Sequence, residues 1–109
     1  MAYDDGLATR LTDALGERTP FSPRKMFGGL ALMVDGNMCI GVMGDDVIAR
    51  VGPDAKAGAL DEPGTRPFDF TGRPMKGWVV VAADHVAEDE DLERWVERCL
   101  AFVRSLPPK

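Results

Sequence analysis

Few residues in this sequence are of the types that carry out nucleophilic catalysis. The cysteines, Cys39 and Cys99, lie far apart in the sequence, and His85 is the only histidine. A Cys-His pair would form only if the fold brought them together, and no third residue that would orient the histidine is indicated. The only serines are Ser22 and Ser105, one before a proline and one at the expected end of a helix. We therefore predict two reduced, buried cysteines and no catalytic residues.

Two other patterns resemble binding motifs without completing them. Residues 88–91 are all acidic, but consecutive carboxylates cannot converge on one metal ion unless a loop folds them around it. They fit the start of a helix better, because carboxylates interact favourably with the helix dipole there. Gly72 and Gly77 have the spacing of half a phosphate-binding loop, but Trp78 and Val79 stand where that motif needs lysine and serine or threonine. The sequence predicts neither a metal site nor a bound cofactor.

The composition is that of one soluble globular domain. The chain has 109 residues, of which 45% are hydrophobic and 28% are charged, and its net charge is −5. Because phosphate contacts supply most of the affinity for nucleic acids, this negative charge argues against direct DNA binding. No apolar run reaches the ~18 residues that span a membrane, and the acidic N-terminus does not resemble a signal peptide. We expect a cytoplasmic protein with no membrane contact.

The hydrophobic spacing predicts the order of the secondary-structure elements. Apolar residues over 3–17 recur on one helical face, and an unbroken apolar stripe predicts a last helix. The stripe consists of Leu92, Trp95, Val96, Cys99, Leu100, Val103 and Leu106. Residues 25–52 have the pattern of a three-stranded meander and 53–60 that of a short helix. Two further strands are expected at 68–70 and 78–82. This order predicts an α+β fold: a single domain with an antiparallel β-sheet of about five strands, and N- and C-terminal helices packed on one face.

Two tight turns set the expected register of the meander. Asp35-Gly36 is a strong signal for a two-residue hairpin, and it places Ala31 opposite Ile40. Gly44-Asp45 forms the second turn. The register sorts the side chains into two faces, and an error of one residue would exchange them. The face expected to meet the helices carries Ala31, Met33, Met38, Ile40, Val42, Val47, Ala49 and Val51. The opposite face carries Leu30, Leu32, Cys39, Gly41, Ile48 and Arg50.

The opposite face is the candidate interaction surface. Contiguous apolar patches beyond a few hundred Å² on soluble proteins mark interaction sites, so this face needs a cover. The short helix at 53–60 could cover it. Otherwise we expect a homodimer that uses this face or an adjacent strand edge, with Arg50 near its rim. The candidate residues are Leu30, Leu32, Ile48, Arg50, Arg73 and Lys76.

Basic residues gather in the middle of the chain, while the acidic surplus lies in the expected helices. These basic residues are Arg18, Arg24, Lys25, Arg50, Arg66, Arg73 and Lys76. A local patch of them could contact a phosphate or an acidic partner. Otherwise they are ordinary surface charges interspersed with acidic ones.

Three stretches together resemble the N-terminal domain of the TfoX/Sxy family of competence regulators. They are Lys25-Met26-Phe27-Gly28-Gly29, residues 70–78 (Phe-Thr-Gly-Arg-Pro-Met-Lys-Gly-Trp) and Glu90-Asp91-Leu92-x-x-Trp95. Their order and spacing match that family along nearly the whole chain, 1–109. The resemblance implies an α+β domain, often self-associating, with no established enzymatic activity. Full-length members are linked to transcriptional control of DNA-uptake genes and pair this domain with a C-terminal one. Since this sequence stops soon after the last helix, we expect a stand-alone form.

We therefore expect a small, cytoplasmic, non-enzymatic domain that acts through contacts with an unidentified protein partner, in regulation of the competence type. Three alternatives remain open. A nucleic-acid-associated module would need its basic residues gathered on one face. A small-ligand-binding module would need a pocket with converging polar groups, and an enzyme would need a perturbed ionisable group in a cleft.

Overall fold

Six antiparallel strands form one sheet in the order β1-β2-β3-β4-β6-β5. The computed structural model describes residues 3–26, 28–70 and 73–108, with the backbone alone for residues 70, 73 and 74. The strands are β1 (Ser22–Met26), β2 (Gly29–Val34), β3 (Asn37–Met43), β4 (Asp46–Arg50), β5 (Thr65–Phe70) and β6 (Arg73–Val81). The helices are α1 (Asp5–Gly16), α2 (Lys56–Leu60) and α3 (Asp89–Arg104), with a 3₁₀ turn, η1 (Ala83–His85), before α3.

The predicted α+β class is confirmed, with six strands in place of about five. The extra strand arises because residues 25–34 do not form one strand: the chain turns back between Met26 and Gly29, and β1 pairs with β2. The backbones of β2 and β3 lie very close together at Gly29. A Cβ at this position would lie 2.1 Å from the carbonyl oxygen of Val42, so the position needs glycine. Pro23 and Pro67 lie in the outermost strands, β1 and β5, where a missing N–H costs no bond to a neighbouring strand.

Both terminal helices form where the hydrophobic spacing predicts them. At the start of α1, the carboxylate of Asp4 accepts a hydrogen bond from the backbone N–H of Leu7 at 3.0 Å, which satisfies a donor that the helix itself leaves unpaired. In α3 the acidic first turn and Arg104 in the last turn both complement the helix dipole. Six members of the predicted α3 stripe, from Leu92 to Val103, are buried.

The register of the meander agrees with prediction in the second hairpin and departs from it in the first. Ile40 faces Ala49, as expected. In the first hairpin Met33 faces Met38 as expected, but Ile40 faces Leu32 where the turn alone would place Ala31. A β-bulge inserts Cys39 as an extra residue, and a bulge shifts all later pairs by one.

The bulge makes part of the predicted face assignment wrong. The large core between sheet and helices receives side chains from β2, β3, β4 and the loop after β4. They are Leu32, Val34, Cys39, Ile40, Val42, Val47, Ala49 and Val51. Cys39 and Ile40 both enter this core although they are neighbours in the chain. The other face instead receives Ala31, Met33 and Met38, which were expected to meet the helices. Leu30 and Leu32, expected on the other face, pack into or against the large core.

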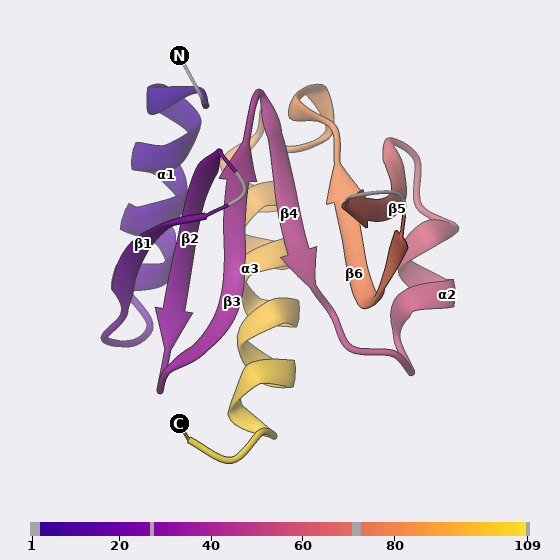
Figure 1. Cartoon of the computed structure of the whole chain (residues 1–109). Coiled ribbons are helices and arrows are strands. Elements are labelled where there is room, and N and C mark those ends of the chain that lie inside the picture. The colour runs from indigo at the N-terminus through magenta and orange to yellow at the C-terminus, as the bar shows by residue number, and fades with distance from the viewer. Residues whose placement is uncertain (1–2, 27, 71–72, 109) are drawn as a thin grey trace.

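The helices lie on one side of the sheet. Figure 1 shows α3 behind β3 and β4, with α1 beside it behind the first strands. The predicted helix at 53–60 starts only at Lys56, and its residues Ala59 and Leu60 pack with the large core. It therefore does not cover the opposite sheet face. In the part of the chain that the structure describes, no helix is long and apolar enough to span a membrane.

Trp95 is the largest side chain in the core that is almost fully buried, with 1% of its surface exposed. Replacing it with alanine removes the largest of the six side chains that α3 buries in the core. We expect Trp95→Ala to lower the free energy of unfolding by about 3–5 kcal/mol, measured by chemical denaturation. Glu97→Ala, on the exposed side of the same helix, is the control and should cost less than about 1 kcal/mol. Equal losses in the two variants would contradict the packing described here.

Candidate functional site

The sheet face turned away from the helices is lined by methionines. Five of the six methionines in the chain contribute to its apolar cluster. We call this surface the methionine face; it comprises Met26, Met33, Met38, Met43 and Met75, together with Ala31, Ile48, Phe68, Trp78 and Val80. All buried residues of α1, α2 and α3 belong to the other cluster. The methionine face is thus the apolar surface against which none of these described helices packs.

The methionine face is buried at its centre and accessible at its margin. Ile48 and Phe68 are each 1% exposed, and the rings of Phe68 and Trp78 lie with centroids 6.1 Å apart. Four of the methionines are only partly buried and pack around this centre. Methionine side chains are flexible and polarizable, so a surface rich in them can adapt to partners of different shape.

Strand alternation places one exposed arginine on this face. Arg24 lies opposite Ala31, whose side chain belongs to the methionine face, and directly opposed residues share a face. The next residue, Lys25, lies opposite Leu30 on the helix side of the sheet. Arg24 and Lys25 are both exposed. Two neighbouring cations therefore project to opposite sides of β1.

A second arginine on this face is paired across the sheet. Arg66 lies opposite Val80, and Asp46 lies opposite Met43, which places both charges on the methionine face. Their side chains form an ion pair of 2.9 Å. Since β6 lies between β4 and β5, this pair reaches over the intervening strand.

Arg50 lies at the end of β4, next to the methionine face. Its guanidinium lies 5.4 Å from the ring centroid of Trp78 and 5.5 Å from that of Phe102 in α3. It also donates a hydrogen bond to the carbonyl oxygen of Met38 at 3.2 Å. Cation–π contacts of this kind are worth about 0.5–1 kcal/mol at accessible sites. Arg50 thus links the end of the sheet to α3.

The structure divides the predicted interaction surface. Leu32 is fully buried in the core on the helix side, and Leu30 packs against that core, so neither belongs to the methionine face. Ile48 lies on the methionine face, and Arg50 lies at its end. Lys76 is exposed on β6, and the side chain of Arg73 lies outside the described part of the structure.

Sequence reasoning did not identify the four partly buried methionines as surface residues. One signal was available, the six methionines in a chain of 109 residues, since methionine is frequent on adaptable binding surfaces. The bulge at Cys39, which moves Met33 and Met38 to this face, carries no comparable signal in the sequence.

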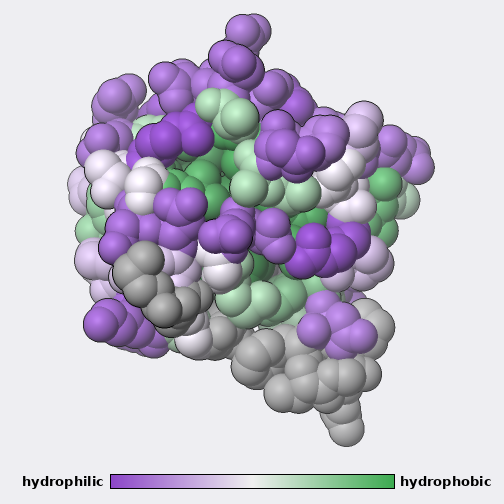
Figure 2. Space-filling view, turned by 90° about the horizontal axis from the view of Figure 1, so that it is seen from above, coloured by the Kyte–Doolittle hydropathy of each residue, from purple (hydrophilic) through white to green (hydrophobic). Residues whose placement is uncertain are grey.

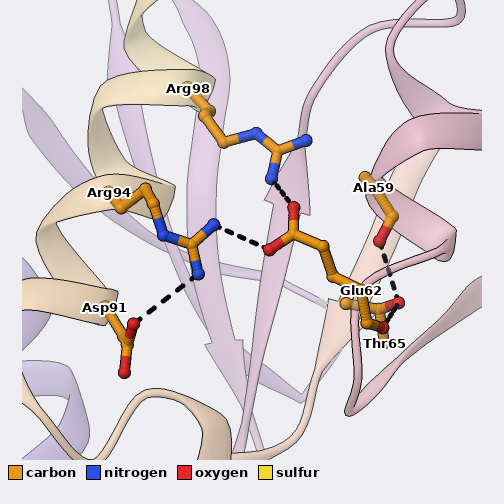
Figure 3. A network of polar contacts seen from close by, with 6 residues as sticks. All are labelled: Ala59, Glu62, Thr65, Asp91, Arg94 and Arg98. Carbon is orange, nitrogen blue, oxygen red and sulfur yellow. Dashed lines mark hydrogen bonds and ion pairs between the residues drawn. The ribbon is translucent and has the colours of Figure 1, made fainter.

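A polar network joins the loop after α2 to α3 (Figure 3). The carboxylate of Glu62 accepts hydrogen bonds from Arg94, at 2.7 Å, and from Arg98. Arg94 is also 3.6 Å from Asp91. Arg98 in turn lies over the ring of Trp95, with its guanidinium 4.4 Å from the ring centroid. The network thus holds the loop over the buried tryptophan.

The hydroxyl of Thr65 fixes the other end of the loop. Its oxygen lies 2.9 Å from the carbonyl oxygen of Ala59 and 2.8 Å from that of Glu62, and its single proton is shared between these two acceptors (Figure 3). Burial alone would raise the pKa of the Glu62 carboxyl, but the hydrogen bonds and charges of Arg94 and Arg98 outweigh it, and the pKa lies below its usual value. The Glu62 carboxylate therefore has a structural role: it holds the loop after α2 against α3.

The two cysteines are buried in the large core and unbonded. Burial raises the pKa of the Cys39 thiol to about 12, against the opposing effect of the Arg50 and Arg104 charges. Burial also raises the pKa of Cys99 well above its usual value, and the nearby Cys39 adds to this. Because the thiolate is the nucleophile, such thiols are unreactive at neutral pH. The prediction that both cysteines are buried is confirmed, and their reduced state stays a prediction.

The remaining candidate groups do not converge on a site. A hollow of about 250 Å³ lies between α1 and α3. Its arginine, Arg10, already donates to Asp89 and to the carbonyl oxygens of Val86 and Ala87. Within residues 3–26, 28–70 and 73–108, no group of three or more His, Cys, Asp or Glu side chains could hold a metal ion. Figure 2, seen from above, shows hydrophobic surface broken by hydrophilic side chains at that end of the molecule.

The lowered pKa of Glu62 predicts a pH-dependent contribution to stability. A carboxyl whose pKa is lower in the folded state stabilises the fold above its unfolded pKa, near 4.5, and loses this effect as the pH falls. We expect Glu62→Gln to lower the free energy of unfolding by about 1 kcal/mol at neutral pH. The difference from wild type should shrink as the pH falls below ~4.5 and through the lower folded-state pKa, in denaturation curves measured at a series of acidic pH values. The exposed Glu90→Gln is the control, and a difference that persisted in acid would contradict an ionic role.

Comparison with known proteins gives one family. The model of the TfoX N-terminal domain matches residues 13–103. The match includes the end of α1 from residue 13 onward, all six strands, and α3 except for its last residue. No curated protein and no solved structure matches the chain significantly. The match covers most of the chain and agrees with the resemblance carried by the three stretches identified from the sequence, so this chain belongs to the TfoX N-terminal domain family.

Proposed function

We propose that this chain is a non-enzymatic regulatory domain that acts through contacts with other proteins, in control of the competence type. Membership of the TfoX N-terminal domain family supports a regulatory role. The observation that carries the proposal is the methionine face: an apolar sheet surface with an adaptable margin, on the side opposite the helices. Such a surface suits protein contacts better than it suits catalysis.

The chemistry of the described side chains supports a binding role. The cysteines carry raised pKa values and cannot act as ready nucleophiles. The Glu62 carboxyl, whose pKa is lowered, is held by hydrogen bonds from Arg94 and Arg98 in a structural network. Perturbed groups that serve catalysis would instead be expected in a cleft beside free reactive groups.

Capture of partners from the cytoplasm of the native host tests the proposal. With the tagged chain as bait at physiological salt, we expect a small set of proteins connected with transcriptional control to be retained in near-stoichiometric amounts. Bait carrying Trp95→Ala, which should be unfolded or strongly destabilised, is the control. Retention of no protein above the level of this control would overturn the proposal. The homodimer expected from the sequence stays a prediction, which sedimentation at micromolar concentration would test.

The charge of the chain predicts its behaviour toward DNA. With a net charge of −5, the domain alone should show no specific binding to duplex DNA at physiological salt, because few phosphate contacts can form. A mobility-shift titration with promoter fragments and random competitor checks this. Sequence-dependent binding below about 1 μM would contradict the expectation and favour a nucleic-acid-associated role.

A further inference from the structure

We propose that the methionine face binds an acidic, amphipathic peptide segment of a partner protein, with Arg24 contacting a carboxylate of that segment. This inference rests on the proposed function, because it specifies the kind of protein contact through which the domain acts. Two features of the face carry it: an adaptable apolar surface, and a positive charge that contrasts with the charge of the whole chain.

The apolar part of the face has a fixed centre and a movable margin. Ile48 and Phe68 at the centre are almost fully buried, while four of the five methionines are half-buried. Each unbranched methionine side chain can change rotamer at little cost and cover an incoming apolar group. A partner can therefore gain buried apolar area without disturbing the core on the helix side.

The charges on this face are predominantly positive. Strand register assigns Arg24 and Arg66 to it, together with the acidic Asp46, and Arg50 lies at its end. Asp46 is paired with Arg66, and Arg50 is held by aromatic rings and a carbonyl oxygen. Among the described residues no carboxylate pairs with Arg24, which is exposed. A chain of net charge −5 thus presents an available cation beside its adaptable apolar surface.

This combination favours an acidic apolar segment over the other possible occupants. Two copies of the chain meeting face to face would bring like charges together around the apolar centre, which opposes association. A nucleic acid would match the positive charge, but a face with few cations around an apolar centre offers few phosphate contacts. An amphipathic segment with carboxylates can cover the apolar area with its apolar side chains and pair a carboxylate with Arg24.

A random peptide library displayed on phage is the probe, selected against the wild-type protein. We expect the enriched peptides to combine aromatic or aliphatic residues with aspartate or glutamate. The best peptide is then titrated into protein labelled with ¹³C in its methionine methyl groups. Binding on the methionine face should shift the signals of Met26, Met33, Met43 and Met75, each assigned by a Met→Leu variant.

The two neighbouring cations of β1 provide a matched pair of variants. Arg24→Glu and Lys25→Glu make the same change of charge at adjacent exposed positions, on opposite sides of the sheet. We expect Arg24→Glu to weaken binding of the selected peptide about tenfold or more, and Lys25→Glu less than about twofold. Arg24→Gln should give an intermediate loss. Melting temperatures confirm that each variant is folded.

Several results would overturn the inference. The library could yield no binder, or the enriched peptides could lack acidic residues. Arg24→Glu and Lys25→Glu could weaken peptide binding equally, or the peptide could leave the methionine signals unshifted. Signals that change with protein concentration alone would assign the face to a second copy. The same shifts caused by a single-stranded oligonucleotide would assign it to nucleic acid. If a captured host protein binds without moving the methionine signals, this inference fails while the proposed function stands.

Discussion

The organisation of this domain depends on one extra residue in the central part of the sheet. Cys39 has no partner of its own in β2, and it enters the core together with its neighbour Ile40. Without that insertion the alternation of β3 would bring Met38 to the helices and move Leu32 away from them. The bulge therefore decides which side chains build the main core and which remain for the second face.

The helix side of the molecule is held by longer-range polar contacts as well as by apolar packing. Glu62 joins a loop near the middle of the chain to Arg94 and Arg98 on the last helix, and Arg98 in turn covers Trp95. Because each arginine is shared between a carboxylate and the tryptophan ring, the network connects the loop, the helix surface and the core. Such coupled contacts are worth more together than isolated surface ion pairs.

Sequence reasoning predicted the parts of the fold that depend on local signals. The α3 stripe, the Gly44-Asp45 turn and the α+β order needed only periodicity and turn residues. The bulge at Cys39 could not be predicted, since it results from the fit of two strands to helices that are distant in sequence. For the candidate site, Ile48 and Arg50 followed from the register of the second hairpin, which is regular. Leu30 and Leu32 were assigned to the wrong face because the bulge lies between them and the Asp35-Gly36 turn, from which the register was counted.

The prolines of the outer strands have a consequence for how this sheet behaves in a crowded solution. A sheet with two open edges can recruit further strands from unrelated chains, and apolar strands make such growth more dangerous. Pro23 and Pro67 interrupt the hydrogen-bonding potential of both borders. The methionine face can therefore stay apolar while the two outer strands resist pairing with strands of other molecules. Other molecules therefore contact this sheet through its side chains, which distinguish one partner from another. Backbone hydrogen bonding at a sheet edge would not make that distinction.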